Sequence, residues 1–146
     1  MRKEYSREDR LERACLRVAM HIRGLYEEKG SSDTRLLEGL FLPDELVLAG
    51  RSRAYTGKGR REHVVPRLVI IKECHDMLER GETDEAVAVF IREHVKIVMI
   101  SDEECSRLDR SAQLGLRQTM PNGWKVGDDV FERLRVAQIE WDPVSD

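Results

Sequence analysis

Several features of secreted and membrane proteins are missing from this chain of 146 residues. It has three cysteines, Cys15, Cys74 and Cys105, an odd number spread widely along the chain, which is typical of reduced thiols and not of a disulfide framework. No apolar run approaches the roughly 18 residues that a membrane span requires. The N-terminus also lacks the apolar centre of a signal peptide. These absences predict a cytoplasmic protein that makes no use of a membrane.

Aromatic residues are scarce, at 5% of the chain, so leucine, isoleucine and valine must fill most of the core. Hydrophobic residues at 40% and charged residues at 36% are typical of a folded globular protein and exclude compositional disorder. A chain of 146 residues usually forms one domain that needs neither a disulfide nor a metal for stability. We therefore predict a single globular domain over residues 1–146.

Hydrophobic periodicity predicts that most of this domain is helical. Apolar residues recur every three or four positions within residues 6–29, where Ser6 can cap the first turn and Gly30 can end the helix. Similar patterns predict further helices over residues 33–42, 66–81, 83–94, 101–112 and 128–136.

A small sheet is predicted beside these helices. Residues 96–100 form a short apolar run typical of a buried strand, and residues 139–141 fit an edge strand. Residues 46–50 fit either a short strand or a buried turn. Gly57 and Gly59 predict a mobile loop, or the turn of a hairpin, within residues 51–61. The expected fold class is α+β, mostly helical with a small sheet.

Charge is distributed unevenly along the chain, although its formal net charge is only -3. Residues 51–72 contain seven basic side chains and one acidic one, whereas residues 73–146 contain nine basic and seventeen acidic ones. A basic segment in an acidic protein indicates a surface for an acidic partner or for nucleic acid. The alternative is that the segment pairs with the acidic C-terminal half of the same chain. The candidate binding residues are Arg51, Arg53, Tyr55, Lys58, Arg60 and Arg61, with Tyr55 able to stack on a base.

Residues 62–66, Glu-His-Val-Val-Pro, resemble the opening of the ββα-metal motif of HNH nucleases. The resemblance implies that His63 activates water and that Glu62 helps to hold a divalent metal. It covers five residues, and the asparagine and the paired cysteines of the family's pattern are absent. Glu62 and His63 are candidate catalytic residues under this hypothesis. The alternative is that His63 only forms a hydrogen bond at the mouth of a loop.

No other motif predicts chemistry. Cys74 and His75 are adjacent in a predicted helix, so their side chains point about 100° apart and cannot easily share one ion. The segment 56–61, Thr-Gly-Lys-Gly-Arg-Arg, lacks the order of a Walker loop. We expect no metal and no cofactor.

Three classes of function are consistent with these features. We favour a small non-catalytic binding or regulatory protein that acts through residues 51–72 on a protein or nucleoprotein partner. Its size and charge would suit an inhibitor or adaptor of nucleic-acid-handling machinery, of the kind that mobile elements or defence systems encode. The alternatives are a reduced HNH-like nuclease centred on Glu62 and His63, and a dedicated nucleic-acid-binding module. The sequence leaves the oligomeric state open.

Overall fold

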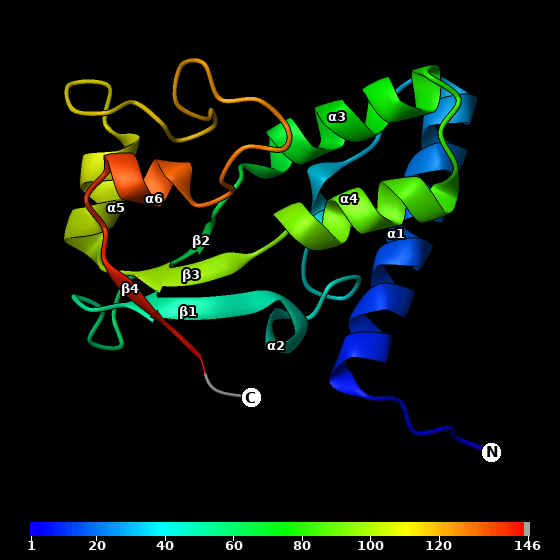
Figure 1. Cartoon of the computed structure of the whole chain (residues 1–146), viewed down its shortest axis with the longest axis horizontal. Helices are drawn as coiled ribbons and strands as arrows, with labels where there is room; N and C mark the ends of the chain where they lie inside the picture. The colour runs from blue at the N-terminus through cyan, green and yellow to red at the C-terminus, as the bar shows by residue number, and fades with distance from the viewer. Residues whose placement is uncertain (145–146) are drawn as a thin grey trace. The chain divides into compact units, whose positions relative to one another are not determined.

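The computed structural model describes residues 1–144, which form six α-helices, one short 3-10 helix and a four-stranded mixed sheet (Figure 1). The predicted α+β class is confirmed. Contacts along the chain define two compact units, the first made of Met1–Val47 with Ile70–Val95 and the second of Leu48–Val69 with residues 96–144. The prediction of a single domain stays a prediction, and the two units are described separately.

The first unit is built on the long helix α1, Arg7–Lys29. Its ends lie where the sequence predicts them: the Ser6 side chain accepts a hydrogen bond from the Asp9 backbone, and Gly30 closes the last turn. One face of α1 is buried and packs against α4, Asp84–His94. The buried side chains are Ala14, Cys15, Val18, Ala19 and Ile22. The predicted apolar stripe is therefore the face that α1 directs into this unit.

The helix predicted over residues 33–42 is wrong. A 3-10 helix covers only Thr34–Leu37, because the Asp33 side chain accepts from the Arg35 backbone and sets a tight first turn. Gly39 then has a positive φ of 53°, which ends any helical run. A separate short helix, α2, follows Pro43 and covers Asp44–Val47. Leu36, Leu37, Leu46 and Val47 are buried, so these short elements still add to the core.

Two helices complete the first unit. Helix α3, Arg67–Glu79, begins in the second unit and belongs mostly to the first, where it buries Ile70, Ile71, Cys74 and Met77. Helix α4 is capped by Thr83, whose side chain accepts from the Ala86 backbone. The Asp84 carboxylate accepts from Arg23 Nε of α1 at 2.5 Å, which ties the first turn of α4 to α1.

The second unit is a sheet with the strand order β2-β3-β1-β4. The strands are β1, Leu48–Ser52, β2, Arg60–His63, β3, Ile97–Ile100, and β4, Trp141–Pro143. The apolar strand β3 runs parallel to β1 and antiparallel to β2, while β4 is an antiparallel edge strand on β1. Helices α5, Asp102–Asp109, and α6, Glu132–Val136, lie over one face of this sheet (Figure 1).

The predicted hairpin is wrong, because β3 lies between β1 and β2 and the two strands do not pair. Helix α5 starts at a capping box of Ser101 and Glu104 but ends at Asp109, before the predicted end at residue 112. Helix α6 starts at Glu132, four residues later than the prediction from Asp128. No helix in the described part of the chain is long and apolar enough to cross a membrane.

Candidate functional site

The basic segment 51–72 is not a single loop, and the loop predicted within residues 51–61 is shorter than expected. The segment covers the end of β1, a turn over residues 53–59, strand β2 and the start of α3. We refer to residues 53–59 as the β1–β2 turn. Among the candidate binding residues, Arg53, Tyr55 and Lys58 lie on this turn, Arg51 precedes it on β1, and Arg60 and Arg61 follow it on β2.

Both stems of the β1–β2 turn are fastened to α5. On the incoming side, Ser52 Oγ donates to Glu104 Oε1 at 2.5 Å, and both side chains are buried. On the outgoing side, Arg60 forms a two-pronged ion pair with Asp109, with donor–acceptor distances of 2.6 and 2.9 Å. Two carboxylates of the same helix, Glu104 and Asp109, therefore hold the two strands at the points where they enter and leave the turn.

Gly59 brings the turn close to the neighbouring strand. Its φ is 152°, and a β-carbon built there would lie 1.9 Å from the backbone oxygen of Ile100. No other residue can occupy this position without moving the backbone. The turn is thus fixed at its outgoing end by both a close backbone approach and the Arg60–Asp109 ion pair.

Glu62 is the centre of a buried charge network. Its Oε1 accepts from Arg133 Nη2 at 2.9 Å, and its Oε2 accepts from Arg60 Nε at 2.8 Å. Arg133 is completely buried and also donates to the backbone oxygens of Leu116 and His63, at 2.6 Å each. Burial lowers the pKa of the Arg133 guanidinium, and the charge of Glu62 opposes that shift. One arginine of α6 therefore ties the edge strand β2 to the loop that follows α5.

This network occupies both carboxylate oxygens of Glu62. Both of its oxygens are engaged by guanidinium groups, which compete with any cation for the same lone pairs. His63 is half-buried on β2, opposite Ile97 of β3. The next secondary-structure element is α3, so the strand–loop–strand that precedes the helix in a ββα motif does not follow His63. Within residues 1–144, no group of three or more His, Cys, Asp or Glu side chains is arranged to hold a metal ion.

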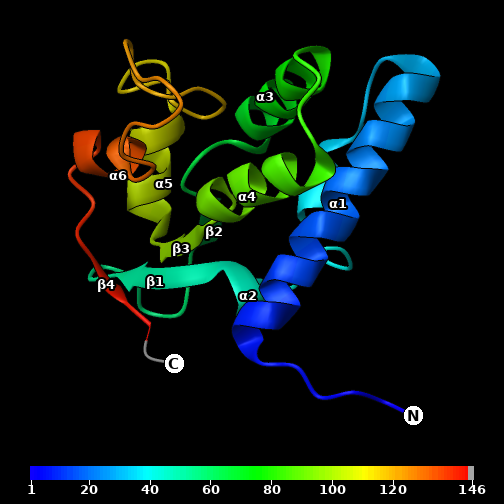
Figure 2. The same ribbon diagram turned by 45° about the vertical axis from the view of Figure 1, so that its right-hand side comes forward.

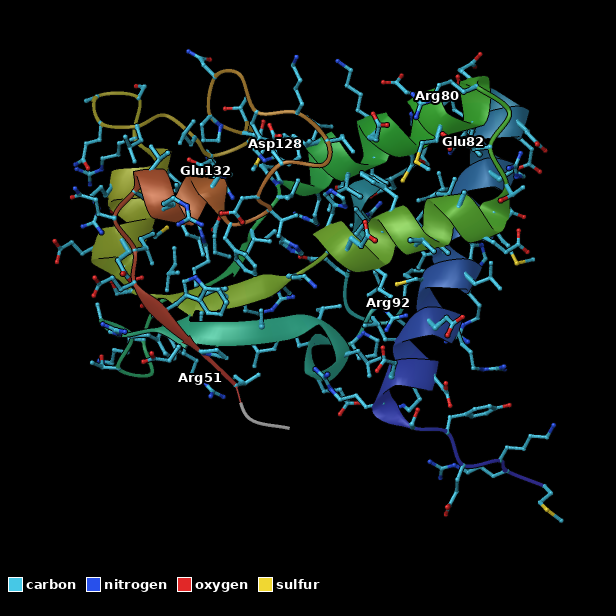
Figure 3. The ribbon with its side chains drawn as sticks, in the orientation of Figure 1. Arg51, Arg80, Glu82, Arg92, Asp128 and Glu132 are labelled. Atoms are coloured by element: carbon cyan, nitrogen blue, oxygen red, sulfur yellow. The ribbon has the colours of Figure 1, made fainter. Side chains whose placement is uncertain are left out.

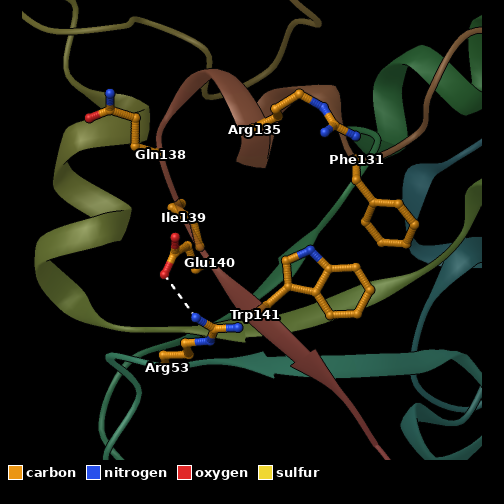
Figure 4. Close-up of a pocket in the computed structure, with 7 residues that line it drawn as sticks. All are labelled: Arg53, Phe131, Arg135, Gln138, Ile139, Glu140 and Trp141. Carbon is orange, nitrogen blue, oxygen red and sulfur yellow. Dashed lines mark hydrogen bonds and ion pairs between the residues drawn. The ribbon is translucent and has the colours of Figure 1, made fainter.

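The acidic C-terminal segment partly neutralises the turn, as the alternative interpretation of the charge predicts. Arg53 pairs with Glu140 at 3.1 Å and with Asp142 at 3.5 Å. Figure 4 shows the Arg53–Glu140 pair beside an open hollow that also contains the tilted rings of Phe131 and Trp141, 4.7 Å apart. The side chains of Arg53, Glu140 and Asp142 are 63–76% exposed, so solvent screens both ion pairs.

Arg51 and Lys58 differ from the other cations among the candidate binding residues, Arg53, Arg60 and Arg61. Both are exposed, and no described residue forms a hydrogen bond or ion pair with either side chain. Ser52 points towards α5, so alternation along β1 directs Arg51 to the opposite side of the sheet, as Figure 3 shows. Tyr55 is only half-exposed. The cations available to another molecule are therefore fewer than the sequence suggests.

The cysteines fit a structural role. Burial raises the pKa of the Cys74 thiol to about 12, so the thiol stays protonated at neutral pH. Burial also raises the pKa of Cys105, and the positive charge of Arg60 only partly opposes this shift. Neither residue has the depressed pKa of a reactive thiol.

Three features of this site are not apparent from the sequence. The sequence does not show that Arg133 is buried, because exposed arginines of an amphipathic helix have the same pattern. It does not show the ion pair of Asp109 either, because an acidic residue at the end of a helix has no distinguishing neighbour. The Phe131–Trp141 ring pair depends on β4 pairing with β1, which no local pattern encodes.

Comparisons of this chain with protein-family models, with curated proteins and with solved structures find no match. The assignment of function therefore depends on the geometry of the site.

We predict that Arg133→Ala lowers the free energy of unfolding by about 3–5 kcal/mol, because it leaves the buried Glu62 carboxylate with half of its charge compensation. Arg135→Ala is the matched control, since Arg135 lies on the same helix, is 68% exposed and, among residues 1–144, pairs only with Asp129 and Glu132. It is expected to change stability by about 0–1 kcal/mol. Chemical denaturation of both variants checks this, and equal small losses would contradict the role given to Arg133.

The Arg60–Asp109 pair predicts part of the acid sensitivity of the fold. The hydrogen bond from Arg60 lowers the pKa of Asp109, so the folded state binds this proton more weakly than the unfolded state. The stability contributed by the pair is present above the unfolded-state pKa of about 3.9 and is lost as the pH falls through the lower folded-state value. Asp109→Asn should therefore reduce stability at neutral pH and flatten its decline below about pH 4. Denaturant titrations across this range measure both effects. An Asp109→Asn variant whose free energy of unfolding declines at low pH as steeply as that of wild type would contradict the role given to the Arg60–Asp109 pair.

Proposed function

We propose that this chain is a small non-catalytic binding protein, an inhibitor or adaptor of nucleic-acid-handling machinery, that contacts its partner through the β1–β2 turn and Arg51. The observation that supports this proposal is the combination of a turn fastened at both stems with outward cations that have no partner within the described chain. Ser52 and Arg60 hold the stems, while Arg51 and Lys58 carry the outward charge.

A turn held in this way is suited to recognition. Its stems are ordered before any partner arrives, so binding loses less conformational entropy than it would with a mobile loop. Recognition sites are more precise when neighbouring contacts fix the backbone that presents them. The tip itself, Tyr55 to Lys58, has no regular structure and can adapt to a partner surface.

The arginines of the segment differ in whether a partner can replace their intramolecular counter-ions. The Arg53 pairs are exposed and worth about 0–1 kcal/mol each, so a carboxylate or phosphate of a partner can replace Glu140 or Asp142. Arg60 cannot be released in the same way, because its side chain is only 35% exposed and holds both Asp109 and Glu62. The proposed contact set is therefore Arg51, Arg53 and Lys58, with Tyr55 beside them.

The charge balance favours a protein or nucleoprotein partner over naked nucleic acid. Phosphate neutralisation supplies most of the affinity of a general nucleic-acid binder, which needs an extended basic face. Here the free cations are few, and acidic side chains at Glu140 and Asp142 lie beside the turn. A local acidic patch on a protein needs only two or three such contacts, supported by electrostatic complementarity.

The experiment is affinity capture with the immobilised full-length protein, from a lysate of the cells that produce it, with and without nuclease treatment. The double variant Arg51→Glu, Lys58→Glu should reduce capture of a partner by at least about tenfold, since like charges then face an acidic surface. Its melting temperature should not change, because neither side chain has an intramolecular ion pair with described residues. Loss of the partner after nuclease treatment would instead favour the nucleic-acid-binding alternative.

The matched control is Arg110→Glu, Lys125→Glu. These two residues are exposed and lie in the same unit but outside the β1–β2 turn, and the change in net charge is identical. The control should retain the partner. Equal capture by all three proteins would contradict the proposal, because the cations of the turn would then have no part in binding.

A further inference from the structure

Helix α1 has a second face with features of an interface. Opposite the buried stripe, exposed or half-exposed residues recur every three or four positions along one line of the helix, as the geometry of 100° per residue requires. They are Arg10, Arg13, Arg17, Met20, Gly24 and Glu28. Figure 2 shows α1 along its length. We call this line of residues the outer stripe of α1.

The charges of the outer stripe are separated along the helix. The N-terminal half carries three arginines, of which Arg10 pairs with Glu45 at 2.5 Å and Arg13 lies over the ring of Tyr5. The C-terminal half carries Glu28, and the neighbouring Glu27 pairs with Arg23 at 3.6 Å. Arg17 and Glu28 are exposed, and neither forms a hydrogen bond or an ion pair with a described residue. A stripe that is positive at one end and negative at the other is complementary to itself when two copies run antiparallel.

The middle of the outer stripe is apolar. Met20 is 55% exposed, and Phe41 lies edge-on against His21 on the same turn of α1, with ring centroids 5.9 Å apart. Leu40, next to Phe41, is 94% exposed. Exposed methionine and aromatic side chains at the centre, with charges towards the rim, match the composition of protein interfaces.

Gly24 adds an independent observation. A glycine inside an exposed helix lowers helix stability relative to alanine, so its presence needs a reason. A β-carbon built at Gly24 would meet nothing within 4 Å in this chain. No intramolecular contact therefore requires a glycine there, whereas a second helix approaching closely from outside would.

We propose that the outer stripe of α1 is the contact surface of a homodimer in which two α1 helices pack antiparallel about a two-fold axis between Met20 and His21. Arg13 and Glu28 lie at equal distances on either side of this point, about 11 Å along the helix at 1.5 Å per residue. In the dimer, Glu28 of each copy faces Arg13 of the other. Gly24 of each copy faces Arg17 of the other and gives its long side chain room.

The size of this surface predicts a weak dimer. A helix of 23 residues is about 34 Å long and about 10 Å wide, which is less than the roughly 800 Å² per partner of a standard interface. The dimer should therefore dissociate on dilution, and salt should weaken it because its rim is ionic. This inference concerns a different surface from the proposed function and does not depend on it.

Sedimentation equilibrium of the full-length protein tests the dimer, from about 10 µM to about 1 mM, the range in which small interfaces dissociate. Wild type should dimerise, Arg13→Glu and Glu28→Arg alone should each weaken the dimer by at least about tenfold, and the two changes together should restore it, because residues 13 and 28 face each other across the two-fold axis. Gly24→Leu should abolish the dimer while it raises the melting temperature, because leucine favours the helix but blocks the close approach. This variant separates loss of association from loss of folding.

Three outcomes would overturn the proposal. The first is a wild-type protein that stays monomeric over the whole concentration range. The second is a dimer that persists in both single charge variants, which would place the interface on another surface. The third is a failure of the double variant to recover the dimer, which would exclude the antiparallel pairing of Arg13 with Glu28.

Discussion

The buried guanidinium of Arg133 determines how the second unit holds its shape. It is fully enclosed and divides its donors between the Glu62 carboxylate and backbone oxygens of β2 and of the loop after α5. A buried charge of this kind is tolerated only when its partners are all in place. Through Glu62 the same network reaches Arg60 and Asp109, and so the outgoing stem of the β1–β2 turn. The geometry of the turn is thus linked to a residue more than seventy positions away in the chain.

This network also changes how the basic segment is interpreted. A count of charges gives residues 51–72 a strong positive excess, but the structure uses part of that excess internally. Arg60 is held by Asp109 and Glu62, and Arg53 is partly neutralised by Glu140 and Asp142. What remains outward is a small cationic tip on a fixed turn. The two interpretations of the segment that the sequence leaves open, an outward surface and an internal counter-charge, therefore apply to different arginines.

The elements that could be predicted from sequence are those with local causes. Helix α1, the Thr83 cap and the Ser101–Glu104 capping box each depend on residues within four positions of one another. The strand β3 was predictable because its apolar run is short and continuous. Prediction failed where the cause was distant. The insertion of β3 between β1 and β2 excludes the hairpin that Gly57 and Gly59 suggest, and the Asp33 cap and Gly39 shorten a helix that apolar periodicity extends. The ion pair between Glu62 and Arg133 could not be predicted, because the two residues lie far apart in the sequence.

The central claim is that Glu62 and Arg133 act as one structural unit, and a double-mutant cycle on their stability tests it most directly. Denaturant unfolding would be measured for Glu62→Leu, Arg133→Met and the double variant. The account predicts that the double variant loses less stability than the sum of the two single losses, by about 1–3 kcal/mol, because removing both partners leaves no uncompensated buried charge. Losses that add to within about 0.5 kcal/mol would show that the two residues act independently and would contradict the account.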